Sequence, residues 1–174
     1  MLPLPKVFFS EDAMHKKKHI WCSIMIVLIV AFDQITKYLA AKYLAGGKIV
    51  PFLPKIAQLR YAENPGMAFS MFSGARWVFV ALTLAVCGGV LWYLLTDRCK
   101  SLWLYWSLGV IVAGGIGNLI DRVRFGFVVD FIEPIFIDFA IFNIADCAVT
   151  CGATVLVVYL LLDCFKKDKS EADE

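Results

Sequence analysis

The stretch SLWLYWSLGVIVAGGIGNLI, residues 101–120, runs for 20 residues without a charged side chain. A helix of about 20 apolar residues is long enough to cross the roughly 30 Å hydrocarbon core of a bilayer. Across the 174 residues of the chain, 60% are hydrophobic and 18% are charged. An average soluble domain has about 45–50% and about 25% respectively, and a soluble core of this size could not bury so much apolar surface. The chain is therefore predicted to be a membrane protein.

Three further apolar segments extend this prediction to four helices. Residues 77–95 are uncharged, residues 139–162 carry a single charge, and an uncharged run over residues 20–32 continues past a short polar turn. The basic stretch before that run also resembles a signal peptide, but the polar turn after it is a poor cleavage region, so we expect it to be retained. The predicted fold class is an all-α membrane protein forming one integral domain of 174 residues. Its predicted helices cover residues 20–44, 76–96, 101–121 and 138–163, with outer loops at residues 45–75 and 122–137.

The lysines and arginines predict how the helices are oriented. Cytoplasmic loops and tails of membrane proteins carry an excess of these residues. One side of the four-helix arrangement holds nine of them: Lys6, Lys16, Lys17, Lys18, Arg98, Lys100, Lys166, Lys167 and Lys169. The other side holds six: Lys48, Lys55, Arg60, Arg76, Arg122 and Arg124. Both termini are therefore predicted to be cytoplasmic, and the two long loops to face outward.

The first outer loop contains a strand pattern. Residues 56–61 and 67–72 are partly aromatic or β-branched, and Glu63-Asn64-Pro65-Gly66 between them has the composition of a turn. We expect a small extracytoplasmic β element between the first two helices.

Polar residues that interrupt the apolar segments converge on the outer ends of the predicted helices. An Asp at the centre of a membrane helix costs about 2.5–3.5 kcal/mol, so such residues need a reason to be there. Asp146 would lie seven residues into the fourth helix, roughly 10 Å below its outer end. The glycines at positions 114, 115 and 117 would let a neighbouring helix come close. The converging residues are Asp33, Lys37, Asn118, Asp121, Arg122, Asp130, Asn143 and Asp146.

A pair of carboxylates in a partly desolvated place can divide acid and base work, because two like charges at close range cannot both ionise easily. Spacing alone leaves Asp121 and Asp130 equally plausible as partners of Asp146. The two histidines, His15 and His19, belong to the cytoplasmic N-terminal stretch, so neither a zinc protease nor a serine–histidine site is expected. Peptide hydrolysis by an aspartate pair fits these residues. The alternative is a small proton-coupled transporter or redox protein, although the polar residues gather at one boundary rather than at the midplane.

The six cysteines and the net charge exclude other classes. The cysteines lack the spacing of metal ligands and lie mostly in apolar runs, which favours a role as small hydrophobic residues. A net charge of +2 does not suggest a nucleic-acid partner.

Five motifs in order resemble those of the bacterial lipoprotein signal peptidase family, signal peptidase II, over nearly the whole chain. They are Asp33-Gln34-x-x-Lys37, Asn64-Pro65-Gly66-Met67-Ala68-Phe69-Ser70, Gly117-Asn118-Leu119-Ile120-Asp121-Arg122, Val128-Val129-Asp130-Phe131 and Phe142-Asn143-Ile144-Ala145-Asp146.

The resemblance implies a metal-independent aspartic endopeptidase without a cofactor. It would remove the signal peptide from prolipoproteins by cleaving before a cysteine that carries diacylglyceryl. It implies a bacterial cytoplasmic (inner) membrane protein whose active site faces outward, and we expect a monomer whose outer loop could close over the substrate. The implied catalytic pair is Asp130 and Asp146. The implied substrate-binding or supporting residues are Asn64, Asn118, Arg122 and Asn143, and the implied structural polar residues are Asp33, Lys37 and Asp121.

Overall fold

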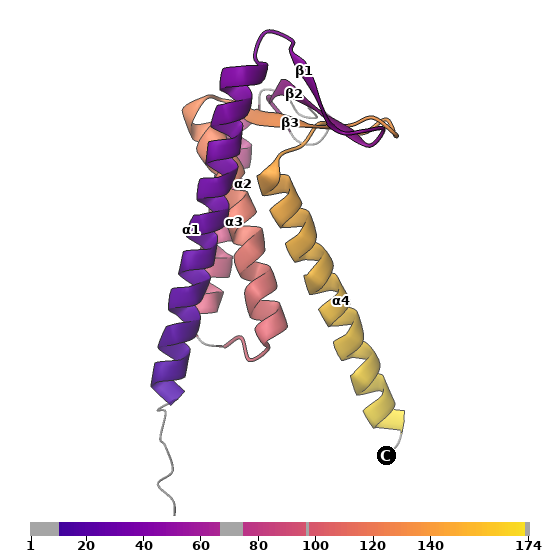
Figure 1. Ribbon diagram of the computed structural model, residues 1–174. Helices are drawn as coiled ribbons and strands as arrows, with labels where there is room; N and C mark the ends of the chain where they lie inside the picture. Colours follow the sequence, from indigo (N-terminus) through magenta and orange to yellow (C-terminus); the bar gives the residue numbers. More distant parts are fainter. Residues whose placement is uncertain (1–10, 67–74, 97, 173–174) are drawn as a thin grey trace, which may run out of the picture.

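The computed structural model describes residues 11–66, 75–96 and 98–172, and in this part of the chain four long helices carry a small sheet at one end (Figure 1). Each of the four helices contains a segment long and apolar enough to cross a membrane. The predicted four-helix arrangement is therefore confirmed. The elements in chain order are α1 (Glu11–Leu44), β1 (Ile49–Leu53), β2 (Ala57–Asn64), α2 (Arg76–Leu95), α3 (Leu102–Arg124), β3 (Val128–Pro134) and α4 (Ile144–Ala172).

The outward faces of the helices are apolar, whereas much of what lies between the helices at the sheet end is polar. Large hydrophobic side chains such as Leu28, Trp77 and Leu161 are exposed, each by more than half of its surface. A soluble protein rarely exposes extended apolar surface of this kind. The distribution is the one expected when lipid surrounds the helices.

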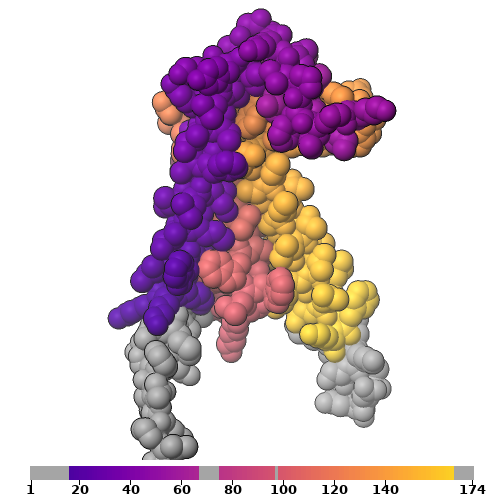
Figure 2. Space-filling view, viewed as in Figure 1, coloured from indigo at the N-terminus to yellow at the C-terminus, as the bar shows by residue number. Residues whose placement is uncertain are grey.

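The three strands form an antiparallel sheet in the order β1-β2-β3. In Figure 1 this sheet lies at the end of the helices opposite the start of α1 and the end of α4. In Figure 2 the sheet extends sideways beyond the start of α4. A β element does lie between the first two helices in the chain, and β2 covers most of the predicted segment 56–61. Its details differ from the prediction: β1 was not predicted, and β2 continues through Glu63 and Asn64, which were expected in a turn, because both pair with β3. The second predicted segment, residues 67–72, lies outside the described residues.

The third strand was not predicted, because it comes from the second outer loop. β3 pairs along β2 with Ala62 opposite Asp130 and Asn64 opposite Val128. Since Asp130 and Glu133 interrupt the apolar pattern of this short segment, only its long-range partner reveals it as a strand.

The fourth helix begins at Ile144, and not near residue 138 as predicted. The residues directly before it are not helical, and Phe142 forms an antiparallel bridge with Ile132, with N–H···O distances of 2.8 and 3.0 Å. An uncharged run cannot by itself distinguish a helix from an extended segment that pairs with a sheet. Asp146 is consequently the third residue of α4, in its first turn, rather than 10 Å inside the helix.

Glycines allow α3 and α4 to pack closely. A Cβ added at Gly114 would overlap the carbonyl oxygen of Ala145, and one at Gly117 would lie 3.0 Å from the Cβ of Ala145. The predicted close approach at these glycines is confirmed, and it brings the start of α4 against the end of α3 that carries the polar residues.

Candidate active site

Five of the six buried polar or charged side chains that the structure describes lie in one cluster, where α1, α3, β3 and the start of α4 meet. Asn143 has no exposed surface, and Asp130 is 3% exposed. Burial of polar groups is unfavourable unless they form hydrogen bonds or ion pairs, so their partners define the site. These five residues are Asp33, Lys37, Asp121, Asp130 and Asn143, and Asn118 and Asp146 are bonded to them.

Asn143 connects Asp130 to Asp146. Its Nδ2 donates to Oδ1 of Asp130 at 2.6 Å, and its Oδ1 accepts from the backbone N–H of Asp146 at 3.0 Å. The backbone N–H of Asn143 in turn donates to Oδ2 of Asp146 at 3.1 Å. This reciprocal pair is a capping box, in which a residue preceding a helix and one in its first turn satisfy each other's backbone N–H groups. One asparagine therefore begins α4 and holds both carboxylates.

Two further asparagines complete the hydrogen bonding of the carboxylates. Asn64 of β2 donates from Nδ2 to Oδ2 of Asp130 at 3.0 Å, and Asn118 of α3 donates from Nδ2 to Oδ1 of Asp146 at 2.8 Å. Each of the four carboxylate oxygens thus accepts one hydrogen bond. Neutral amide donors hold the two groups in place without adding a formal charge.

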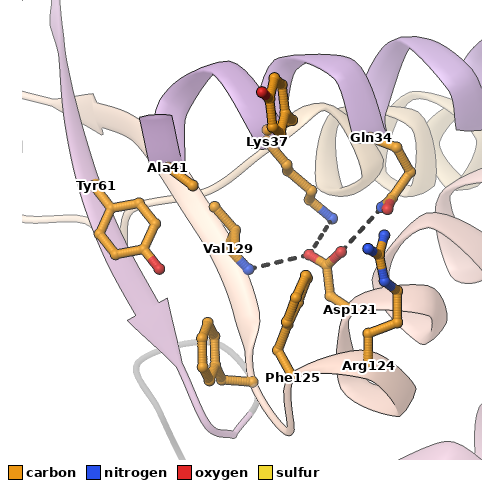
Figure 3. A pocket seen from close by; sticks show the side chains of 10 residues that line it. Gln34, Lys37, Ala41, Tyr61, Asp121, Arg124, Phe125 and Val129 are labelled. Carbon is orange, nitrogen blue, oxygen red and sulfur yellow. Dashed lines mark hydrogen bonds and ion pairs between the residues drawn. The ribbon is translucent and has the colours of Figure 1, made fainter. Parts of the chain in front are cut away.

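Asp121, the other carboxylate that spacing left open as a partner of Asp146, has a different environment. Its Oδ2 accepts from Lys37 at 3.0 Å and from the backbone N–H of Val129 at 3.1 Å, and its Oδ1 accepts from Gln34 at 3.0 Å (Figure 3). Asp121 therefore braces β3 against α1 and α3, whereas it is Asp130 that Asn143 joins to Asp146.

Lys37 is the cation at the centre of this cluster. Its Nζ lies 2.9 Å from Oδ2 of Asp33, 3.0 Å from Oδ2 of Asp121 and 2.8 Å from Oδ1 of Asn118. An ammonium group has three protons to donate, and each faces an acceptor. Asp33 and Lys37, four residues apart on α1, form an ion pair, and Lys37 also reaches Asp121 and Asn118 of α3.

Asp33 also satisfies the start of α4. Its Oδ1 accepts from the backbone N–H of Ala145 at 2.8 Å. The first N–H groups of a helix have no partner within the helix, and a carboxylate placed there is favoured by the helix dipole. Asp33 therefore fixes α4 to α1 at the level of the carboxylate pair.

Arg122 reaches the turn after β2 instead of the carboxylates. Its Nη2 donates to the carbonyl oxygen of Gly66 at 3.0 Å, and its guanidinium lies 5.5 Å from the ring centroid of Phe79. The residues that follow Gly66 in the second motif, residues 67–70, lie outside the described residues.

Burial raises the pKa of the Asp130 carboxyl to about 6, and the charge of Asp146 adds to this rise. The amide hydrogen bonds from Asn64 and Asn143 and the charge of Lys37 oppose it. A carboxyl group with such a pKa holds its proton at a pH where an ordinary aspartic acid has lost it. This property suits a general acid.

Gln34 belongs to the first motif, but its role was not predicted. Its Nε2 lies within hydrogen-bond distance of Asp121 and of the Gly117 carbonyl oxygen, at 3.0 and 3.2 Å. The sequence feature that could have indicated this role is the presence of a polar residue directly after Asp33 in an otherwise apolar helix. Gln34 also lines a cavity of about 160 Å³ behind β3, on the side away from Asp130, together with Lys37, Tyr38, Ala41, Tyr61, Asp121, Arg124, Phe125, Phe127 and Val129 (Figure 3).

Among the described residues, no group of three or more His, Cys, Asp or Glu side chains is placed to hold a metal ion. All six cysteines are free thiols, and Cys22, Cys87 and Cys99 are buried in apolar packing.

Comparisons with known proteins give a consistent result. A family model described as signal peptidase (SPase) II matches residues 25–162. Lipoprotein signal peptidases of Streptococcus pyogenes serotypes M6 and M5 are each 42% identical over 135 residues, which cover 78% of this chain and 89% of each relative. A bacterial membrane enzyme structure determined by the in meso method at 2.3 Å resolution superposes with a TM-score of 0.79 and 34% identity, covering 84% of this chain and 90% of the other.

Proposed function

Because this chain belongs to the signal peptidase II family, the aspartic-type proteases that remove signal peptides from prolipoproteins, we propose that Asp130 and Asp146 are its catalytic pair. The observation that carries the proposal is the bridge made by Asn143, whose side-chain amide donates to the carboxylate of Asp130 and whose backbone N–H donates to the carboxylate of Asp146. The transporter or redox alternative has no comparable support, since the relatives are peptidases.

The two carboxylates have different roles in the proposed reaction. Asp146, in its ionised form, accepts a proton from a water molecule, and the oxygen of that water attacks the carbonyl carbon of the scissile peptide. Asp130, which holds its proton to a higher pH than an ordinary aspartic acid, donates it to the carbonyl oxygen. The tetrahedral intermediate then collapses: the proton taken up by Asp146 passes to the leaving amine, the C–N bond breaks, and one hydroxyl proton of the intermediate returns to Asp130. Peptide C–N cleavage and the consumption of one water balance the reaction.

The proposed substrate is a prolipoprotein whose cysteine carries a diacylglyceryl group, with cleavage immediately before that cysteine. Its two acyl chains would stay in the lipid while the scissile bond reaches the carboxylates at the end of the helices. Arg122 and Asn64 would contact the substrate backbone. In support of this, Arg122 already donates to a backbone carbonyl, that of Gly66.

We propose that the protein lies in the bacterial cytoplasmic membrane with both termini in the cytoplasm and the sheet and active site on the outer side. The excess of lysine and arginine at the termini and the turn between α2 and α3 supports this orientation. A monomer is proposed, and it is supported by the hydrogen bonds of the two carboxylates, which are complete within a single chain.

The test is cleavage of a lipidated prolipoprotein by purified Asp130→Asn and Asp146→Asn variants. Each substitution keeps the size of the side chain and removes its acid–base function, so each should lower kcat by at least about 10²-fold. Asp138→Asn is the matched control, since Asp138 is exposed and lies in the segment between Asp130 and Asp146. Thermal unfolding would verify that all three variants are folded. Native turnover by either Asp130→Asn or Asp146→Asn would overturn the assignment.

A further inference from the structure

The side-chain amide of asparagine has two ends of similar shape and opposite hydrogen-bonding character. Asn118 donates to Asp146 only if its NH₂ group faces that carboxylate. If the amide were rotated by half a turn, a carbonyl oxygen would face Asp146 instead. Something must therefore select the orientation of Asn118.

The selecting group is the ammonium of Lys37, which lies 2.8 Å from Oδ1 of Asn118. An ammonium group only donates hydrogen bonds, so it requires an oxygen opposite it and excludes an NH₂ group. Asn118 Oδ1 also accepts from Nδ2 of Asn143, at the longer distance of 3.1 Å. That second donor is neutral, and hydrogen bonds from charged donors are roughly twice as strong as those from neutral ones.

The other two asparagines of the site are oriented by backbone groups. Oδ1 of Asn143 accepts from the N–H of Asp146, and Oδ1 of Asn64 accepts from the N–H of Gly66. Asn118 is the member of the three whose carbonyl is held by a charged side chain from another helix. Its orientation is therefore the one that a single substitution outside the carboxylates can release.

We propose that Lys37 is a positioning residue, which locks the amide of Asn118 so that its NH₂ group faces Asp146 and keeps that carboxylate available as the base. This inference rests on the proposed function, and it assigns to Lys37 a role beyond neutralising Asp33 and Asp121. Lys37 acts through Asn118 and does not touch the reacting atoms.

The proposal predicts the direction in which the pH dependence of activity changes when Lys37 is removed. Without Lys37, Asn118 can present its carbonyl oxygen to Asp146, which disfavours the carboxylate relative to the protonated acid. As the pH is lowered, activity that depends on the carboxylate is then lost at a higher pH than in the native enzyme. The acidic limb of the pH profile of kcat/KM therefore moves to higher pH. The charged and titratable groups around Asp146 that remain constant in this comparison are Asp33, Asp121, Arg122, Asp130 and Cys147.

The experiment compares Lys37→Met with Lys37→Gln. Both side chains are uncharged and one bond shorter than lysine, so both leave Asp33 and Asp121 without their cation. Glutamine still offers an NH₂ donor to Asn118, whereas methionine offers none.

Cleavage of a lipidated prolipoprotein is measured across pH for each variant, with thermal unfolding in parallel. Lys37→Met should lower kcat/KM about tenfold or more and move the acidic limb upward by about one pH unit, the scale of one hydrogen bond to a charged group. Lys37→Gln should move the limb by less, because both variants lose the charge of Lys37 and only the methionine variant also loses the donor to Asn118. Equal limb positions for the methionine and glutamine variants would overturn the proposal.

A second measurement covers the case in which neither Lys37 variant accumulates as folded protein. In native protein labelled with ¹⁵N-asparagine, the side-chain NH₂ signal of Asn118 is identified by its loss in Asn118→Ala. This signal should shift in Asp146→Asn, because the NH₂ group faces that carboxylate, and an unchanged signal would contradict the proposal. A native enzyme that fails to cleave the prolipoprotein would instead refute the proposed function, so the two failures are distinguishable.

Discussion

Asp130 and Asp146 are both aspartates held by amides, yet the position of each in the fold prepares it for a different role. Asp130 lies on a strand, is almost fully buried and has a raised pKa. Asp146 lies in the first turn of α4, where its carboxylate caps the N–H of Asn143. Two carboxyl groups whose environments differ can act as acid and base at the same pH.

The hydrogen bond from Asn64 to Asp130 is expected to influence the pH at which activity is lost on the basic side of the pH profile. The hydrogen bond that the side-chain amide of Asn64 donates favours the ionised form of Asp130. Removing this hydrogen bond therefore raises the pKa of Asp130 above about 6. The acid then stays protonated to a higher pH, and the basic limb of kcat/KM in Asn64→Ala should move upward by about one pH unit.

Gln58→Ala is the control for this experiment. Gln58 lies on the same strand and donates to the carboxylate of Glu133 at 2.7 Å, outside the site. Its loss should leave both limbs in place. A downward shift of the basic limb in Asn64→Ala would contradict the assignment of Asp130 as the acid.

At the scale of elements, the contact between α3 and α4 positions the carboxylates. Gly117 lies where α3 meets Asp33 and the start of α4, and a Cβ there would be 2.6 Å from Oδ2 of Asp33. This contact holds the carboxylate that caps Ala145. The packing of the helices and the hydrogen bonding of the site therefore depend on the same glycine.

Gly117→Ala should destabilise the protein by about 1–3 kcal/mol, the usual cost of overpacking, and should reduce activity by displacing α4. Gly88→Ala in α2 is the matched control, because a Cβ there meets nothing within 4 Å. Since alanine is the better helix former, the control should unfold at the same or a slightly higher temperature. Thermal unfolding of both variants in detergent would measure the difference. A Gly117→Ala variant as stable and as active as the control would show that the close approach is not required.

At the scale of the whole molecule, the sheet and the carboxylates lie at one end of four apolar helices. The start of α1 and the end of α4 lie at the other end (Figure 1). A protease with this shape can act at a membrane surface while its substrate remains anchored in lipid. The proposed orientation requires that the sheet end face outward.

Orientation can be tested with single cysteines in a cysteine-free background of confirmed activity. Lys48 and Lys100 are exposed residues at opposite ends of the helices, before β1 and before α3. In intact cells, a membrane-impermeant maleimide should label Lys48→Cys, whereas Lys100→Cys should react only after permeabilisation. The reverse pattern would refute the proposed topology.

Composition and local pattern by themselves showed that this is a membrane protein with four helices, and they identified the polar residues of its site. These features are local, because the length of an apolar run and the presence of Asp33, Asn118 or Asp146 within it are visible without knowing the fold. The order of five motifs supplied the family.

Only the tertiary structure decided which of these residues are joined by hydrogen bonds. That Asp130 rather than Asp121 is joined to Asp146 depends on β3, a strand that exists because it pairs with β2. That α4 begins at Ile144 depends on the bridge between Phe142 and Ile132, which takes the preceding residues out of the helix. Hydrogen bonds between segments far apart in the chain have no signal in local sequence, and in this protein such bonds pair the two carboxylates.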